Sequence, residues 1–244
     1  MYYKLVSKSY KINSKIRKFR QLAVADYLAS KIANIFIPIF LILKINPNKI
    51  TIINILLSLI TIILVNISES EYFGYAIALF VFCKIIDHVD GGVARIIKGK
   101  TFFGKFLDSL NDAFLMSIFY LAISFYCFNL TQNYTLFIIG IIAPIFLLMN
   151  TLILDKFSAL VRWCNDQNKK NFPSYIRKKK LLRFFLTFED INFLSIIFLF
   201  FYKNDIVVTE IIFSIICLSI FLSSIINLIM HSFYAYRYLS FSKK

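Results

Sequence analysis

The sequence is poor in charged residues, glycine, proline and cysteine. Charged residues make up 17% of its 244 positions, below the quarter that is usual in soluble domains, and hydrophobic residues reach 59%. Such a composition excludes a disordered chain and argues against an ordinary soluble protein. With six glycines and four prolines the chain is no loop-rich scaffold. The four cysteines show no CxxC or other metal-binding spacing, so we expect buried thiols and no disulfide framework.

Acidic residues are the scarcest charged class. There are 13 Asp and Glu against 28 Lys and Arg, which gives a formal net charge of +15. A protein this basic can bind nucleic acid, an anionic membrane surface or a phosphorylated substrate. The positions of the basic residues relative to the apolar runs decide among these partners.

Long apolar runs are abundant, and six of them approach the roughly 20 residues that a membrane-spanning helix needs. They lack period-2 alternation and are joined mostly by short polar turns, which is typical of antiparallel helices in lipid. We therefore predict an all-α integral membrane protein with six transmembrane helices. Their ranges are 50–65, 72–97, 104–128, 134–154, 191–202 (extended back to 184) and 206–234, and the polar stretch at 163–180 is predicted to be a loop.

The basic residues fall almost entirely on one side of this arrangement. With six spans, 27 of the 28 Lys and Arg lie on the side of both termini, and Lys203 alone lies opposite. The positive-inside rule then places both termini in the cytoplasm, in a protein of the cytoplasmic membrane. The positive charge therefore sets the orientation of the protein in the membrane and favours binding to anionic lipids. No nucleic acid is expected as a partner.

Residues 1–46 are predicted to be a basic segment ahead of a transmembrane domain at 47–240. Residues 22–43 are apolar but interrupted by Asp26, Lys31 and Pro38, so we expect an amphipathic juxtamembrane helix on the anionic leaflet. An additional span is the alternative, although it would disturb the charge sorting. No small-residue cleavage site follows the apolar run, so a cleaved signal peptide is not expected.

Four of the 13 acidic residues gather at the cytoplasmic ends of the second and third spans. Asp87 and Asp90 are three positions apart and Asp108 and Asp112 are four apart, so each pair shares a helix face. Carboxylates in an apolar site need positive charge to stay ionised, and oxygen ligands suit Mg²⁺ or Mn²⁺. We predict that these four aspartates bind two such ions. His88 is turned about 100° from Asp87 and is expected to be a bystander.

The residues between the two pairs suit a phosphate-bearing substrate. Gly91 and Ala94 allow a ligand or a neighbouring helix to approach the backbone. Arg95 offers a forked donor for phosphate, Thr101 adds a hydroxyl in the turn, and Gly104 thins the facing helix. Pairs of metal ions held in this way clamp phosphoryl oxygens during displacement reactions.

This spacing resembles the signature of the CDP-alcohol phosphotransferases. The pattern is Asp87-x2-Asp90-Gly91-x2-Ala94-Arg95-x8-Gly104-x3-Asp108-x3-Asp112, and all eight of its positions are filled. The segment Pro47-Asn48-Lys49-Ile50-Thr51 is similar to the short Pro-Asn-x-x-Thr element that precedes the signature in this family. Beyond the first three spans, the resemblance extends only to the six-helix architecture.

The resemblance implies an activity and residue roles. Members transfer a phospho-alcohol from a CDP-linked donor to the hydroxyl of an acceptor and release CMP. Asp87, Asp90 and Asp108 would be metal ligands, and Asp112 would contact metal and deprotonate the acceptor. The CDP donor would be bound by Asn48, Thr51, Gly91, Ala94, Arg95, Thr101 and Gly104. The resemblance also implies a homodimer.

The sequence leaves the acceptor alcohol open. Residues 104–110 look like the serine-using branch, but Ala113-Phe114 replaces the Phe-Gly that follows the last aspartate there. The Arg at that position in many inositol-phosphate enzymes is also absent. The basic N-terminal extension and residues 187–190 look more like members that use inositol-phosphate-type or cell-surface polymer substrates. Candidate cations for a phosphorylated acceptor are Lys105, Lys156 and Arg162, for which positive-inside topology is the simpler explanation.

We therefore expect a metal-dependent membrane transferase that moves phosphatidyl from CDP-diacylglycerol to a small alcohol in phospholipid synthesis. The alternative within the family is another CDP-alcohol or an inositol-phosphate or polymer substrate. A cation transporter or a non-catalytic scaffold is the alternative of another class. The transporter is disfavoured because the chain shows no repeated halves, and the scaffold because no signature residue is lost.

Overall fold

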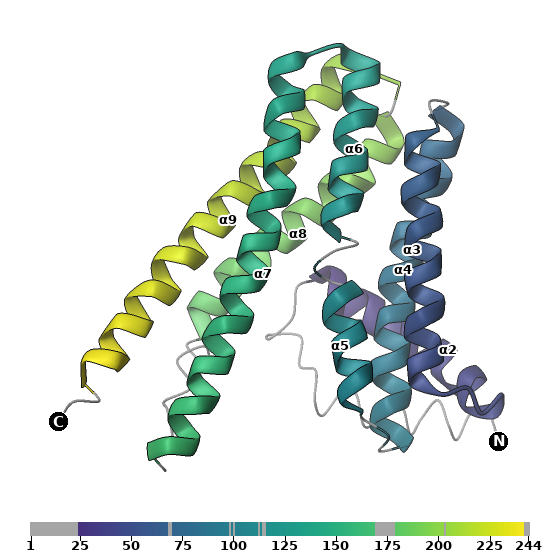
Figure 1. The fold of residues 1–244 in the computed structure, drawn as a ribbon. Coiled ribbons are helices and arrows are strands. Elements are labelled where there is room, and N and C mark those ends of the chain that lie inside the picture. Colours follow the sequence, from purple (N-terminus) through teal and green to yellow (C-terminus); the bar gives the residue numbers. More distant parts are fainter. Residues whose placement is uncertain are drawn as a thin grey trace.

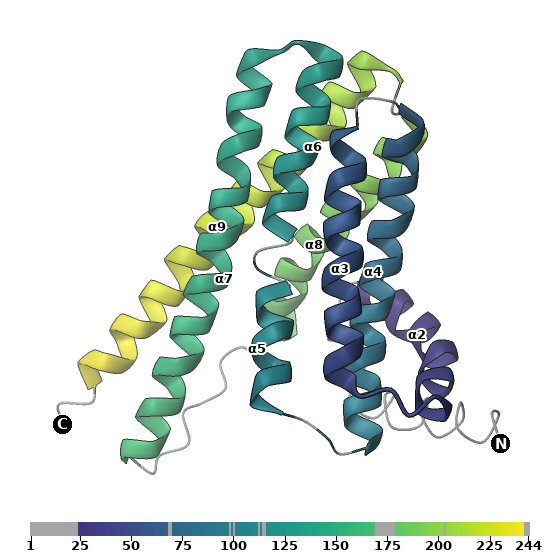
Figure 2. The same cartoon turned by 45° about the vertical axis from the view of Figure 1, so that its right-hand side comes forward.

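The computed structural model describes residues 24–67, 70–97, 99, 101–111, 113, 116–168, 179–202 and 204–241, and these form a helical bundle. Its eight helices are α2 (Val24–Ile42), α3 (Pro47–Asn66), α4 (Ser70–Ile97), α5 (Phe102–Leu110), α6 (Met116–Thr131), α7 (Tyr134–Asn168), α8 (Lys179–Tyr202) and α9 (Ile206–Phe241). In Figures 1 and 2, α3 and α4 run side by side and α2 lies obliquely near their lower ends. The prediction of an all-helical fold is confirmed.

Four of the described helices contain segments long and apolar enough to cross a membrane. They are Val24–Ile42 in α2, Pro47–Asn66 in α3, Tyr134–Ile153 in α7 and Ile206–Phe233 in α9. Met116–Thr131 and Ile191–Tyr202 are shorter apolar helices. Many large apolar side chains on the outer faces of α3, α7 and α9 are exposed, which suits contact with lipid chains. The helices are thus typical of an integral membrane protein.

The predicted single helix over 104–128 is wrong, because the structure divides this stretch into α5 and α6. Asn111 and Ala113, which lie between the two helices, adopt the wider π-helical turn. The side chain of Asn111 is buried. The widened turn therefore places a polar amide in the interior of the bundle, at the point where the regular α-helix ends. Figure 2 shows the result: α5 lies beside the lower half of α3, and α6 is displaced above it.

The predicted loop at 163–180 is partly wrong as well. Helix α7 continues to Asn168 and α8 begins at Lys179, so only residues 169–178 fall outside the described helices. At roughly 1.5 Å per residue the 35 residues of α7 extend over about 52 Å, which exceeds the apolar core of a bilayer. The charged C-terminal end of α7 therefore remains helical beyond the membrane, although its polar composition predicts a loop.

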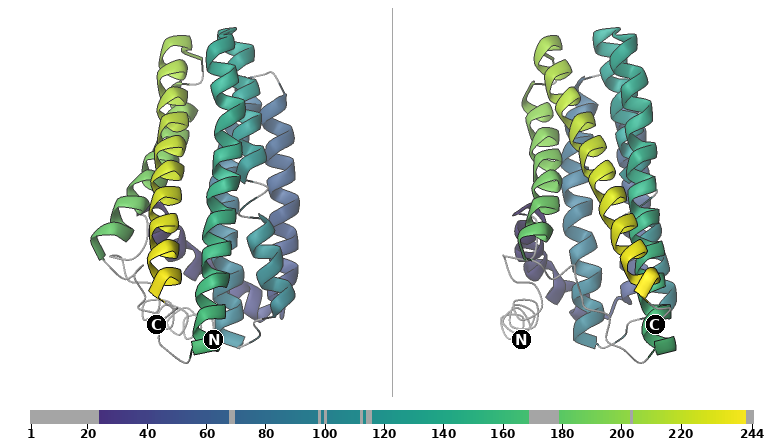
Figure 3. Two further views of the ribbon diagram at one scale, coloured as in Figure 1. Left: turned by 60° about the vertical axis from the view of Figure 1, so that its left-hand side comes forward. Right: turned by 90° about the vertical axis from the view of Figure 1, so that its left-hand side faces the viewer.

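Two groups of buried side chains hold the bundle together. The larger joins α3 and α4 to α6–α9, and in it Phe73 stacks on Tyr126 and Phe80 on Phe119, with ring centroids 3.7 and 4.1 Å apart. The smaller group joins α2, α3 and the lower part of α4 and consists of Ala33, Ile37, Ile50, Ile86, Val89 and Val93. The left panel of Figure 3 shows α8 and α9 on the opposite side of the bundle from α3 and α5. The smaller group fixes the end of α4 that carries the first two aspartates.

Candidate functional site

Three aspartates from two helices come together at the lower end of the bundle. Asp87 and Asp90 lie on α4 and Asp108 on α5, and one carboxylate oxygen of each lies within 4.8 Å of the others. Asp90 is buried, Asp87 is half-buried, and Asp108 is the most accessible. The spacing of three residues on α4 puts the first two on one face, as the sequence predicts. Asp112, the predicted fourth ligand and base, lies outside the described residues.

Asp90 is oriented by a hydroxyl from the neighbouring helix. Thr51 of α3 donates from Oγ1 to Asp90 Oδ2 over 2.7 Å, and the same hydroxyl lies 3.2 Å from the carbonyl oxygen of Pro47. Thr51 and Asp90 are both buried, so water competes little for this bond. Bonds of this kind fix the direction in which a carboxylate faces a cation.

The beginnings of α3 and α5 meet beside the aspartates. The side chain of Asn46 caps α3 by accepting from the backbone N–H of Asn48 at 3.1 Å. Thr101 caps α5 by accepting from the N–H of Gly104 at 2.9 Å, and its hydroxyl donates to Asn48 Oδ1 at 3.2 Å. Two helix N-termini, each with a partial positive charge, are thereby held together where an anion could bind.

Gly104 makes this contact possible. A Cβ at Gly104 would lie 2.6 Å from Asn48 Oδ1 and 3.0 Å from Thr101 Oγ1, so a side chain there would displace these two side chains and break the hydrogen bond between them. At Gly91 the nearest atom to an added Cβ is the Arg95 guanidinium, at 3.2 Å. That side chain is flexible and can give way. The two glycines of the signature therefore differ, since Gly104 leaves room for the hydrogen bond between Asn48 and Thr101 and Gly91 leaves room for Arg95.

A cavity of about 570 Å³ lies over these residues, within the usual range for ligand sites of roughly 300–1,000 Å³. It is lined by all seven residues predicted to bind the donor, namely Asn48, Thr51, Gly91, Ala94, Arg95, Thr101 and Gly104. Asp90, Asp108 and Lys105 line it too. Residues from three helices that are far apart in the sequence thus converge on one cavity, which we call the large cavity.

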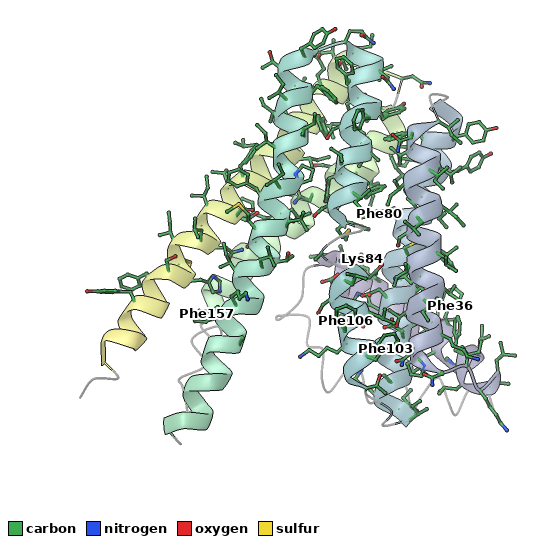
Figure 4. The ribbon with its side chains drawn as sticks, viewed as in Figure 1. Phe36, Phe80, Lys84, Phe103, Phe106 and Phe157 are labelled. Atoms are coloured by element: carbon green, nitrogen blue, oxygen red, sulfur yellow. The ribbon has the colours of Figure 1, made fainter. Side chains whose placement is uncertain are left out.

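A second cavity of about 40 Å³, here the small cavity, adjoins Asp87. Its polar lining is Asn54, Ser58, Thr61, Lys84, Asp87 and Asn111, and its apolar lining is Phe80, Cys83, Met116 and Phe119. Figure 4 shows Phe80 and Lys84 at the height where α5 gives way to α6. The sequence analysis missed this cavity. The available signal was the spacing of Asn54, Ser58 and Thr61, which places three polar residues on one face of an apolar helix.

Helix α2 supplies a further carboxylate behind the aspartates. Asp26 Oδ1 lies 3.1 Å from Lys84 Nζ and 3.6 Å from His88 Nε2. His88 therefore faces α2. Of the cations considered for a phosphorylated acceptor, Lys105 lines the large cavity, whereas Lys156 is exposed on α7 and lines neither cavity. The side chain of Arg162 lies outside the described residues.

The aspartate cluster fits a hard cation. Three carboxylate oxygens within 4.8 Å repel one another unless positive charge lies between them. All three are oxygen donors, which Mg²⁺, Ca²⁺ and Mn²⁺ prefer over nitrogen and sulfur. Asp87, Asp90 and Asp108 could therefore hold a metal ion.

Comparison with known families agrees with this geometry. The chain has no match among the curated proteins. The CDP-alcohol phosphatidyltransferase family model matches residues 44–216, which is more than half of the chain and includes α3, both helices of the aspartate cluster and the large cavity. The chain therefore belongs to the CDP-alcohol phosphatidyltransferase family, whose enzymes transfer a phospho-alcohol from a CDP-linked donor.

Proposed function

We propose that this enzyme transfers the phosphatidyl group of CDP-diacylglycerol to the hydroxyl of a small alcohol and releases CMP, as a step of phospholipid synthesis. The observation that carries the proposal is the large cavity, which gathers seven candidate donor-binding residues and two of the clustered aspartates. Helix α3, which lines one side of the cavity, is apolar and long enough to cross a membrane. A donor with a polar nucleotide and acyl chains suits a polar cavity enclosed by apolar surface.

The chain supplies the groups that the reaction needs. Asp87, Asp90, Asp108 and Asp112 would hold two ions, Mg²⁺ or Mn²⁺, which when bound would neutralise charge on the CMP leaving group. Arg95, which lines the large cavity, would bind the diphosphate through its guanidinium fork. The residues at the starts of α3 and α5 line the same cavity, and the partial positive charge of these two helix ends would favour an anion there.

The transfer itself moves one proton and exchanges one bond. The acceptor O–H gives its proton to a carboxylate, for which the signature assigns Asp112. The acceptor oxygen then forms a bond to phosphorus while the bond from phosphorus to the CMP oxygen breaks. Thr51 keeps Asp90 in one orientation during this exchange, so it acts as a positioning residue.

We assign six membrane crossings to α3, α4, α5 with α6, α7, α8 and α9, and a position on the cytoplasmic leaflet to α2. The charge distribution supports this assignment, because Arg95 and Lys105 lie at the large cavity on the side that is rich in basic residues. The cavity would then open to the cytoplasm. A homodimer is the expected assembly.

A phosphorylated acceptor, such as an inositol phosphate, is the second candidate. The observation that favours it is Lys105, which lines the large cavity together with Asp108 and Arg95. A phosphate group bound to Lys105 would lie close to the aspartate cluster, and this arrangement would suit an alcohol that carries its own negative charge.

The test is CMP release by the purified protein in lipid nanodiscs with CDP-diacylglycerol and Mg²⁺ or Mn²⁺. Serine, glycerol 3-phosphate and an inositol phosphate are supplied one at a time, and an Asp90→Asn variant is the inactive control. We expect CMP from one acceptor class in a metal-dependent manner. Absence of CMP with every acceptor would exclude CDP-diacylglycerol as the donor.

A further inference from the structure

The small cavity contains two buried amide oxygens that lack a hydrogen-bond donor. Asn54 on α3 is 1% exposed and Asn111 after α5 is 7% exposed, and both line the cavity. Among the residues that the structure describes, no group donates to either Oδ1. Buried polar atoms are rarely left unpaired, because burial without a hydrogen bond is costly. A ligand that carries O–H or N–H groups is therefore expected between them.

The rest of the polar lining also favours a donor group. Ser58 and Thr61 give their hydroxyl protons to backbone carbonyls of their own helix, at Asn54 and Leu57, over 2.9 Å in each case. Their oxygens then present lone pairs to the cavity. Lys84, the one cation in the lining, is paired with Asp26 at 3.1 Å. Amide, hydroxyl and carboxylate oxygens of this lining can accept from hydroxyl or amine groups, and the Asp87 carboxylate disfavours a phosphate there.

The size of the small cavity limits what can enter. Its volume of about 40 Å³ is sufficient for roughly three water-sized groups. Phe80 and Phe119, stacked on each other, close its apolar side. The cavity therefore suits one end of a small alcohol and not a sugar ring.

The small cavity also lies on the side from which an acceptor would attack. Asp87 lines the small cavity, whereas Asp90 and Asp108 line the large one, so the carboxylate cluster separates the two. In phosphoryl transfer the attacking and leaving oxygens lie roughly in line through phosphorus. If CMP leaves from the large cavity, the acceptor hydroxyl approaches from the opposite side of the cluster, where the small cavity lies.

We propose that the small cavity is a subsite for small 1,2-diols and 2-amino alcohols; this inference rests on the proposed function. The reacting hydroxyl of such an acceptor faces phosphorus, and the O–H or N–H group on its neighbouring carbon donates to Asn54 and Asn111. Water takes the same bonds when no acceptor is bound. Asn54 and Asn111 thereby determine specificity by requiring a second donor group beside the reacting hydroxyl.

The first test uses Asn54→Leu and Asn111→Leu, which remove the amide oxygen while keeping most of the side-chain volume. We expect the KM of the accepted diol or amino alcohol to rise about tenfold, as loss of one or two neutral hydrogen bonds implies. The KM of CDP-diacylglycerol and the affinity for Mn²⁺, measured by electron paramagnetic resonance without substrate, should stay unchanged. Asn66→Leu, the same substitution at an exposed position of α3, is the matched control. An unchanged acceptor KM in both variants would overturn the inference.

The second test needs no variant and no turnover. Cys83 lines the small cavity and is 6% exposed, so its thiol reports on occupancy. We expect 1,2-propanediol or serine to slow the reaction of Cys83 with methyl methanethiosulfonate, followed by peptide mass spectrometry, and ethanol to have little effect. Equal rates with and without the diol and the amino alcohol would contradict the subsite. If the diol or amino alcohol protected Cys83 but the enzyme released no CMP, the subsite would be supported and the proposed function would be wrong.

Discussion

Buried asparagines behave differently in two regions of this molecule. Between α7 and α9, the amide of Asn227 donates to Asn150 Oδ1 at 2.7 Å, so the two residues satisfy each other across the helices. Beside the aspartates, Asn54 and Asn111 are buried like Asn227, yet their amide oxygens have no donor among the described residues. The first region uses polar groups to hold helices together in lipid, and the second leaves them available to a ligand.

Glycine shows the same contrast. A Cβ at Gly140 of α7 would lie 2.7 Å from Ser124 Oγ of α6 and 2.7 Å from the Phe213 ring of α9, so this glycine serves helix packing. Gly104 serves the contact between the Asn48 and Thr101 side chains, both of which line the large cavity. The role of an asparagine or a glycine in this fold therefore depends on what it contacts and cannot be inferred from the residue type alone.

The largest effect is expected from removing a clustered carboxylate. Asp90→Asn keeps the size of the side chain and removes its charge, so metal affinity should fall strongly and CMP release should drop about 10³-fold or more. Thermal stability should be kept or raised, because repulsion within the cluster is relieved. The measurements are CMP release, Mn²⁺ titration and a melting curve. Metal-dependent turnover near the wild-type rate would contradict the role of Asp90.

Gly104→Ala should come next, with a loss of roughly 10²-fold in kcat/KM, since displacement of reacting groups by about 1 Å has that order of cost. The added methyl would displace the Asn48 and Thr101 side chains at the start of α5, the helix that carries Asp108. The melting temperature should change little, because the beginning of α5 is partly exposed.

Gly140→Ala is the matched control for this prediction. It introduces the same methyl group into a buried contact of α6, α7 and α9 whose residues line neither cavity. We expect a clear drop in melting temperature and a wild-type kcat/KM for the protein that stays folded. If Gly140→Ala lowered kcat/KM and Gly104→Ala did not, the division into a packing region and a site region would be wrong.

A smaller loss is expected for Thr51→Val, which removes the hydrogen bond to Asp90 and keeps the shape of the side chain. Groups that orient metal ligands typically contribute 10- to 100-fold to metal affinity, and we expect about tenfold here because one bond is lost. Calorimetric titration with Mn²⁺ measures it. Thr209→Val on α9, where the hydroxyl donates to the Tyr202 carbonyl, is a control that should leave metal affinity unchanged. If Thr51→Val and Thr209→Val had the same affinity for Mn²⁺, Thr51 would not be a positioning residue for Asp90.

The smallest effect is expected for Asp26→Asn on α2. This change removes the carboxylate that lies 3.1 Å from Lys84 Nζ and so adds net positive charge one helical turn from Asp87, which weakens cation binding only a few-fold, because partly exposed charges are screened. The double variant Asp26→Asn, Lys84→Gln restores the charge balance and should recover wild-type Mn²⁺ affinity. A loss that persists in the double variant would mean that Asp26 acts through packing of α2.

The sequence alone predicts much of the site and less of the fold around it. Asp87 and Asp90 are predictable because residues three apart share a helix face, and Asn48 and Thr51 because the family resemblance includes them. The division at Asn111 is not, since no Gly or Pro lies between Lys105 and Phe128 to indicate the end of a helix. The extension of α7 to Asn168 could not be predicted from the sequence, because charged residues are typical both of loops and of exposed helices.

The contacts of Asp26 and the position of Asn54 at the small cavity lie beyond sequence reasoning for another reason. They depend on the rotation and depth of α2 and α3 relative to α4, which are set by the buried contacts of Ala33, Ile37 and Val89. No spacing along one helix contains that information. The contacts of such residues can be recognised only when the position of the neighbouring helix is known.

The central claim is that the aspartate cluster transfers a phosphatidyl group from a CDP-linked lipid to an alcohol. The most direct measurement follows CMP and the new phospholipid together, by chromatography and mass spectrometry, in vesicles that contain the protein, CDP-diacylglycerol, Mn²⁺ and serine or glycerol 3-phosphate. The wild-type protein should form both products in equal amounts, and Asp90→Asn should form neither. CMP without a new phospholipid, or equal products from both proteins, would contradict it.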